Sequence, residues 1–111
     1  MTTVKQLLQT KGHNVWTVTP DNSVHEALKL MVEKNVGALV VLEAKNLVGI
    51  ISERDYARMT ILKEDLSMAT PVSEIMTKKV IGIRPEQTIE ECMALMTDKH
   101  VRHLPVFADD Q

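Results

Sequence analysis

An internal repeat constrains this chain more than any other feature of its sequence. Shifting the chain by 65 positions aligns residues 15–42 with residues 80–107 without a gap, and nine of the 28 aligned pairs are identical. The identical pairs include Pro20 with Pro85. Because a duplicated sequence folds into two copies of one supersecondary unit, the repeat predicts a single compact domain built from two similar halves.

Two helix starts carry the same capping pattern. Ser23 is followed three residues later by Glu26, and at the aligned positions Thr88 is followed by Glu91. In such a capping box the hydroxyl accepts a hydrogen bond from the third helical N–H, and the carboxylate accepts one from the N–H of the capping residue. We therefore expect a helix from Ser23 to near Asn35 and an equivalent helix after Thr88.

Strands and a second helix complete the first copy. Residues 15–19 alternate in the manner of a strand, and the apolar runs 36–42 and 47–52 flank a short polar turn, as in a hairpin. Residues 53–61 have helical composition. The first copy therefore predicts the order β-α-β-β-α, and the fold class is α/β (α+β).

The second copy breaks off inside the hairpin turn. Gln111 aligns with Asn46, so nothing in the sequence corresponds to residues 47–59. We expect a truncated second repeat for that reason. The predicted segments are residues 1–62 for the first repeat with an N-terminal piece, 63–71 for a polar linker, and 72–111 for the incomplete second repeat.

Composition excludes several classes of protein. A net charge of −2 gives no electrostatic attraction to nucleic acid or to an anionic membrane. The single cysteine excludes an internal disulfide and fits a reducing compartment. No apolar run approaches membrane-spanning length, so a cytoplasmic protein is expected. No nucleophile–base grouping or phosphate-binding glycine loop is evident, and we expect neither an enzyme nor a metal protein.

Two residue types invite a chemical role but have simpler explanations. His100 and His103 lie three apart near Asp98, but on a strand this spacing places the two rings on opposite faces, which does not suit a metal. Cys92 aligns with Ala27 on the expected buried face of a helix. We predict that Cys92 is a core residue and not a nucleophile.

The end of the apolar run 47–52 offers groups that suit a ligand. Ser52 comes where the strand stops, and Asp55 lies in the first turn of the helix that follows. This arrangement presents a hydroxyl, free backbone N–H groups and a carboxylate that can accept hydrogen bonds from a ribose diol. The same residues also suit an ordinary helix start, with Ser52 as the cap and Asp55 favoured by the helix dipole. This stretch alone leaves both interpretations open.

Taken together, these features resemble a tandem pair of cystathionine-β-synthase (CBS) domains, and the small stand-alone bacterial CBS-pair proteins in particular. Besides the Gly-x-x-Ser-x-x-Asp run at residues 49–55, the strings Ile-Met-Thr at 75–77 and Arg-His-Leu-Pro-Val at 102–106 are typical of that family. The resemblance covers essentially the whole chain. It implies two repeats packed with pseudo-twofold symmetry, and two clefts that bind adenosyl ligands such as AMP, ADP, ATP, NAD or S-adenosylmethionine.

For the sugar and phosphates, the resemblance implies a role for four residues. Asp55 matches the carboxylate that grips the ribose hydroxyls, and Ser52 matches the hydroxyl beside the ribose and α-phosphate. Arg102 and His103 match the cationic pair that reaches the phosphates. We also expect Asp55 to lie at the solvent edge, so that it contributes little to stability.

For the base, the resemblance implies backbone contacts from two strand entries. Lys79, Val80 and Ile81 match the segment that contacts the adenine edge in one cleft. Val15 and Trp16 would do the same in the other cleft, whose Ser/Thr-x-x-Asp falls in the part of the repeat that the sequence lacks.

The expected function is that of a regulatory module that senses energy or redox state through an adenosyl nucleotide and acts on a partner protein. The alternative is a ligand-free scaffold that only dimerises. Ser52 with Asp55, and Arg102 with His103, favour the sensor, because a scaffold does not need them. In either case we expect a homodimer formed by the helices that follow Ser23, Glu53 and Thr88, with no nucleic acid and no membrane as partner.

Overall fold

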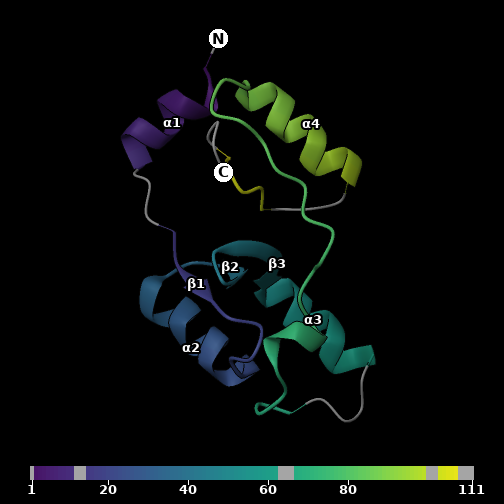
Figure 1. The fold of residues 1–111 in the computed structure, drawn as a ribbon. Coiled ribbons are helices and arrows are strands. Elements are labelled where there is room, and N and C mark those ends of the chain that lie inside the picture. Colours follow the sequence, from purple (N-terminus) through teal and green to yellow (C-terminus); the bar gives the residue numbers. More distant parts are fainter. Residues whose placement is uncertain (1, 12–14, 63–66, 100–102, 108–111) are drawn as a thin grey trace. The chain divides into compact units, whose positions relative to one another are not determined.

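The computed structural model of the chain describes residues 2–11, 15–62, 67–99 and 103–107. It contains both helices and strands, so the predicted mixed α+β class is confirmed (Figure 1). The elements in chain order are α1 (Val4–Lys11), β1 (Thr17–Val18), α2 (Val24–Lys34), β2 (Ala38–Glu43), β3 (Asn46–Ser52), α3 (Glu53–Leu62), the 3-10 helix η1 (Val72–Glu74) and α4 (Ile89–Lys99).

The chain divides into two compact units. The first, called the sheet unit, comprises Val15–Val80. The second, called the two-segment unit, combines Met1–Asn14 with Ile81–Gln111.

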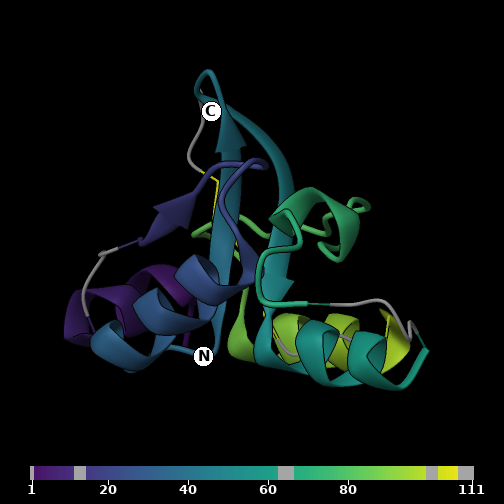
Figure 2. The same cartoon turned by 90° about the horizontal axis from the view of Figure 1, so that it is seen from below.

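The sheet unit is built on three strands in the order β1-β2-β3. β1 lies parallel to β2, and β2 and β3 form the predicted antiparallel hairpin (Figure 2). β1 is shorter than the predicted strand at 15–19. The N–H of Thr19 donates to the side-chain oxygen of Asn22 at 2.7 Å, so the chain turns at Thr19 and the strand ends at Val18.

The helix predicted after Ser23 is confirmed, together with its capping box. The N–H of Glu26 donates to Ser23 Oγ at 3.0 Å, and the N–H of Ser23 donates to Glu26 Oε1 at 2.8 Å. The helix ends at Asn35, which adopts the left-handed conformation with φ of 54°. The buried face of α2 packs into the core of the sheet unit. That core comprises Val18, Val24, Ala27, Met31, Leu39, Val41, Ile51, Val72 and Ile75.

The capping box makes the stability of α2 depend on pH. The hydrogen bond from the Ser23 backbone, followed by that from the Asn22 side chain, lowers the pKa of Glu26 from its ordinary value. A carboxyl whose folded-state pKa is lowered contributes stability above its ordinary pKa and loses it as the pH falls through the folded-state value.

We therefore expect the difference in melting temperature between the wild type and Glu26→Gln to shrink on acidification. Glutamine retains the acceptor oxygen but does not titrate. Thermal unfolding at about pH 7 and about pH 3 measures the difference on both sides of the ordinary carboxyl pKa. A difference that stays constant between the two pH values would contradict the assignment to Glu26.

The segment that precedes each repeat in the sequence packs with the other repeat. Ahead of α2, the N–H of Val24 donates to the Thr70 carbonyl and the N–H of Val72 to the Asn22 carbonyl, both at 2.8 Å. The same pattern recurs ahead of α4. There the N–H of Ile89 donates to the Thr2 carbonyl at 3.0 Å, and the N–H of Val4 donates to the Gln87 carbonyl at 2.8 Å. These bonds satisfy amides at a helix start that have no partner inside the helix.

The compact units therefore cut across the sequence segments. The N-terminal piece assigned to the first repeat belongs with residues 81 onward, and residues 67–80 belong with the first repeat. Residues 67–71 of the predicted linker contribute backbone acceptors, because His25 N–H also donates to the Met68 carbonyl at 3.0 Å. The division into repeats at 1–62, 63–71 and 72–111 stays a prediction.

The two-segment unit confirms the second predicted capping box. The N–H of Glu91 donates to Thr88 Oγ1 at 3.1 Å, and the N–H of Thr88 donates to Glu91 Oε1 at 2.8 Å. Cys92 is buried beside Val4 and Ile83, as predicted for a core residue. Burial, followed by the charge of Glu91, raises the pKa of the Cys92 thiol, so the unreactive protonated form is favoured.

Within the described residues, the predicted strands of the second repeat are reduced to one parallel bridge. Ile83 N–H donates to the Pro105 carbonyl at 2.9 Å, and Phe107 N–H donates to the Ile83 carbonyl at 2.8 Å. The position aligned with Pro105 is Val40, whose N–H donates to the Trp16 carbonyl. Proline has no N–H, so this ladder bond cannot form in the second repeat.

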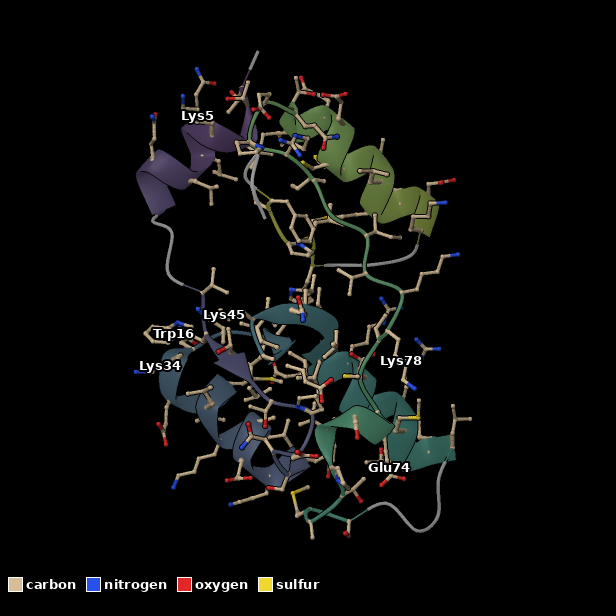
Figure 3. The ribbon with its side chains drawn as sticks, in the orientation of Figure 1. Lys5, Trp16, Lys34, Lys45, Glu74 and Lys78 are labelled. Carbon is tan, nitrogen blue, oxygen red and sulfur yellow. The ribbon has the colours of Figure 1, made fainter. Side chains whose placement is uncertain are left out.

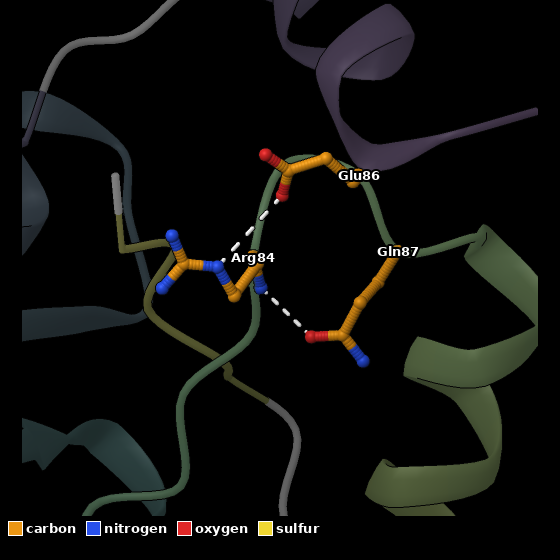
Figure 4. Close-up of polar contacts among 3 residues, drawn as sticks. All are labelled: Arg84, Glu86 and Gln87. Carbon is orange, nitrogen blue, oxygen red and sulfur yellow. Dashed lines mark hydrogen bonds and ion pairs between the residues drawn. The ribbon is translucent and has the colours of Figure 1, made fainter. Parts of the chain in front are cut away.

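The turn before each capping box confirms the duplication at the level of single hydrogen bonds. In the two-segment unit Arg84 N–H donates to Gln87 Oε1 at 2.8 Å, as Thr19 N–H does to the side chain of Asn22 (Figure 4). An ion pair at 3.9 Å joins Arg84 Nε to Glu86. Both of its side chains are largely exposed, so it adds little to stability.

Candidate functional site

Ser52 and Asp55 form a reciprocal capping box at the junction of β3 and α3. The N–H of Asp55 donates to Ser52 Oγ at 3.1 Å. Asp55 Oδ2 accepts from both the N–H and the hydroxyl of Ser52, each at 3.0 Å. Ser52 is buried at 7% exposure, and Asp55 is half-buried. The capping interpretation is therefore confirmed, whereas these contacts do not test the ligand interpretation.

Thr77 is a third member of this cluster, and its sequence context predicts no such role. Its hydroxyl donates to Asp55 Oδ1 at 3.1 Å across 22 residues of sequence. Two backbone hydrogen bonds with Ile50, at 2.8 and 3.0 Å, hold Thr77 beside β3. Asp55 thus accepts three hydrogen bonds while it remains half-buried, and for this reason we expect it to contribute more to stability than a residue at the solvent edge without partners.

Gly49 allows the Thr77 segment to approach the sheet. A side chain at this position would place its Cβ atom 2.9 Å from the Thr77 carbonyl oxygen and 2.8 Å from Met76 Sδ. Such distances are too short for a carbon atom, so the glycine of the Gly-x-x-Ser-x-x-Asp run has a steric role here. It lets residues 76 and 77 lie against β3 and brings the hydroxyl to Asp55.

The other helix starts of this chain provide a comparison for the Asp55 cluster. Each of the helices α1 to α4 begins with a reciprocal box, including Thr3 with Gln6 ahead of α1. Among the described residues, the hydrogen bonds that the carboxylates of Glu26 and Glu91 accept all end on Oε1. Asp55 uses both carboxylate oxygens, and the second binds a residue outside the box. This cluster is thus more than a helix cap.

Val15 and Trp16, predicted to contact a base, lie at the start of the sheet unit. Val15 is 64% exposed. The Trp16 carbonyl already accepts from Val40 N–H at 3.3 Å, and the ammonium of Lys34 lies 4.4 Å from the centroid of the Trp16 ring (Figure 3). Lys34 therefore covers one face of the ring through a cation–π contact.

The remaining predicted residues are divided between the two units. Lys79 is exposed and Val80 is half-buried, and both follow Thr77 in the sheet unit. Ile81 is half-buried and His103 is exposed, and both belong to the two-segment unit. Arg102 lies outside the described residues. A side-chain hydrogen bond brings Ser52 and Asp55 together, and the roles of the other predicted site residues stay predictions.

Other kinds of site find no support in the described ranges. Three or more His, Cys, Asp or Glu side chains do not gather there in a way that could hold a metal ion. His100, half of the histidine pair near Asp98, lies outside these ranges. None of the described helices has both the length and the apolar character needed to cross a membrane.

Relatives of known sequence and structure resemble the chain over nearly its full length. The chain is 42% identical to the mitochondrial CBS domain-containing protein CBSX3 of Arabidopsis thaliana, and the match covers 97% of this chain but only 57% of that protein. A solved structure of a CBS-domain protein from Burkholderia ambifaria is 48% identical, with a TM-score of 0.93 over 99% of this chain and 83% of its own.

Two further solved structures contain ligands. CBSX2 was crystallised in complex with AMP; it is 28% identical to this chain, with a TM-score of 0.75 over 99% of this chain and 84% of its own. The CBS domain pair of MJ0100 was crystallised with 5′-methylthioadenosine and S-adenosylmethionine. It is 25% identical, with a TM-score of 0.83 over 98% of this chain and 82% of its own.

The family model described as the CBS domain matches this chain twice, at residues 4–60 and at residues 72–111. Each match contains one of the two aligned segments, residues 15–42 and residues 80–107, and together the matches cover most of the sequence. The predicted resemblance is confirmed: the chain belongs to the CBS-domain family.

Proposed function

We propose that this chain is a regulatory module that binds an adenosyl nucleotide, with Asp55 as the residue that holds the ribose. AMP and S-adenosylmethionine, the ligands of the two related structures, share the ribose diol that Asp55 would bind. Such a module would bind its ligand without catalysing a reaction. The ligand would act by changing the state of a partner protein in response to energy or redox conditions.

The Asp55 cluster is the observation that carries this proposal. Its carboxylate is held by the N–H and the hydroxyl of Ser52, so it does not have to be ordered when a ligand arrives. Asp55 is only half-buried, which leaves the carboxylate accessible from solvent. A ribose diol supplies two hydroxyl donors, and donors to a charged acceptor form the stronger class of hydrogen bonds.

Contacts to the base and the phosphates would complete the binding site. Lys79, Val80 and Ile81 would contact the adenine, with Val15 and Trp16 in the equivalent role for a second ligand. His103, together with Arg102, would face the phosphates. A guanidinium is planar and permanently charged, and it suits a phosphate for that reason.

Ligand identity can be tested directly on the purified protein. Native mass spectrometry would detect an adenosyl compound that co-purifies, and calorimetric titration would compare AMP, ATP, NAD, S-adenosylmethionine and adenosine. We expect at least one of them to bind, and a titration with buffer alone to give no binding heat. If no adenosyl compound binds or co-purifies, the ligand-free scaffold becomes the better account of this chain.

Exposed apolar side chains on the helices support a homodimer as part of the proposal. They are Val32 on α2 at 79% exposure, Ile61 and Leu62 on α3 at 83% and 69%, and Met93 on α4 at 62%. Covering solvent-exposed aliphatic groups with a second copy removes them from water, which favours association. Sedimentation velocity at several protein concentrations should show dimers, and a monomer throughout the micromolar range would remove this part of the proposal.

A further inference from the structure

The acceptor positions of Asp55 are nearly all occupied within the protein itself. An ionised carboxylate offers about four positions for hydrogen-bond donors, two on each oxygen. Oδ2 accepts from the N–H and the hydroxyl of Ser52, and Oδ1 accepts from the hydroxyl of Thr77. Counting donors from the described part of the chain, one position is left, on Oδ1. A diol that donates two hydrogen bonds to this carboxylate must therefore displace one of the donors already present.

The contact from Thr77 is the easiest of the three to displace. Ser52 and Asp55 are joined by three mutual hydrogen bonds, and Ser52 is buried. The hydrogen bond from Thr77 is single and exposed, so water can replace it when it breaks. The backbone of Thr77 is held separately by its two bonds to Ile50, so its hydroxyl can rotate away without unfolding the segment.

We propose, building on the proposed function, that the Thr77 hydroxyl is an internal competitor that occupies the position of a ribose hydroxyl on Asp55 until a ligand takes it. Binding of the diol exchanges one donor for another on Oδ1, so part of the binding free energy is spent on this exchange. The affinity for adenosyl ligands is lower than the same carboxylate would give without Thr77.

A role in positioning Asp55 is the opposite account of the same contact. However, the box with Ser52 and the place of Asp55 in the first turn of α3 already define the position of the carboxylate. The hydroxyl of Thr77 adds a donor at the one oxygen that Ser52 does not use. The two accounts predict opposite changes in affinity when that hydroxyl is removed.

Thr77→Val tests the proposal, since valine keeps the branched shape and the backbone pairing with Ile50 but has no hydroxyl. We expect adenosine and AMP to bind this variant roughly two- to tenfold more tightly than wild type, which corresponds to the loss of one exposed competing hydrogen bond. 2′,3′-Dideoxyadenosine has no diol, and its affinity should not change. The measurement is calorimetric titration, with folding checked by Trp16 fluorescence.

Thr60→Val is the matched control. Thr60 also lies in the sheet unit, and its hydroxyl donates to the Ala57 carbonyl within α3 at 2.7 Å rather than to Asp55. This variant should bind adenosine with wild-type affinity. Thr77→Ser retains a hydroxyl and should also remain close to wild type.

Each other outcome overturns the inference. If Thr77→Val binds adenosine equally or more weakly, Thr77 is not a competitor, while the proposed function stands. A gain that extends to 2′,3′-dideoxyadenosine would show a general loosening in place of competition for the diol, and the proposed function would again stand. If neither wild type nor variant binds any nucleoside, the proposed function fails and the inference fails with it.

Discussion

Asp55→Ala is expected to weaken the binding of AMP by roughly ten- to a hundredfold. The substitution removes the carboxylate that would accept the ribose hydroxyls, and a hydrogen bond to a charged group contributes about 1.5–3 kcal/mol. It should also lower the free energy of unfolding by about 1 kcal/mol, because the carboxylate no longer accepts hydrogen bonds from Ser52 and Thr77, although the N–H of residue 55 can still donate to Ser52 Oγ. Calorimetric titration and urea unfolding measure the two effects separately.

Glu26→Ala separates the loss of ligand binding from the loss of a helix cap. Glu26 occupies the same third helical position in the box that begins α2, within the same unit. This variant should lose a similar amount of stability but retain the wild-type affinity for AMP. If the two variants weakened AMP binding equally, the effect of Asp55→Ala would arise from destabilisation, and Asp55 would have no direct role in binding the ligand.

Ile75→Ala should lower the free energy of unfolding by about 2–5 kcal/mol, more than the loss of a helix cap does. Ile75 belongs to the second repeat by sequence, but its side chain is 2% exposed in the core of the sheet unit with Val24 and Val72. Replacing this side chain by that of alanine would leave a cavity in a core made mostly of residues from the first repeat. Trp16 is the only tryptophan of the chain and lies in the same unit, so its fluorescence during urea unfolding reports the loss.

Ile61→Ala provides the matched control for this measurement. It removes the same atoms from the same residue type in the same unit, but Ile61 is 83% exposed on α3. We expect its effect on the free energy of unfolding to be within about 0.5 kcal/mol of zero. Similar losses in the two variants would argue against the assignment of residues 72–76 to the core of the sheet unit.

The sequence by itself determined the features that depend on neighbouring residues. The boxes of Ser23 with Glu26 and of Thr88 with Glu91, the hairpin of β2 and β3, and the core position of Cys92 were all predicted and are confirmed. Capping boxes are closed within one helical turn, and strands show an apolar pattern along the chain. Such features follow from residue type and spacing alone. The duplication and the family resemblance rest on the same kind of pattern.

The strands of the second repeat could have been predicted better from the sequence alone. The duplication suggests the same strands in both repeats, because the apolar pattern of residues 80–107 matches that of residues 15–42. Pro105 aligns with Val40 of the first repeat. The N–H of Val40 donates to the Trp16 carbonyl, and a proline has no N–H that could make the equivalent bond. Apolar pattern is only one requirement of a strand, and the availability of backbone donors is another.

Only the tertiary structure decided which distant segment meets Asp55 and which segments share a core. Thr77 lies 22 residues from Asp55, and residues 67–80 pack with the first repeat while residues 2–11 lie with the second. A carboxylate oxygen or a helix-start amide must find a partner, but many donors and acceptors in the chain satisfy that need equally well. The partner is selected by the packing of the whole unit, here by Gly49 admitting residues 76 and 77 to the sheet, because local sequence does not specify long-range neighbours.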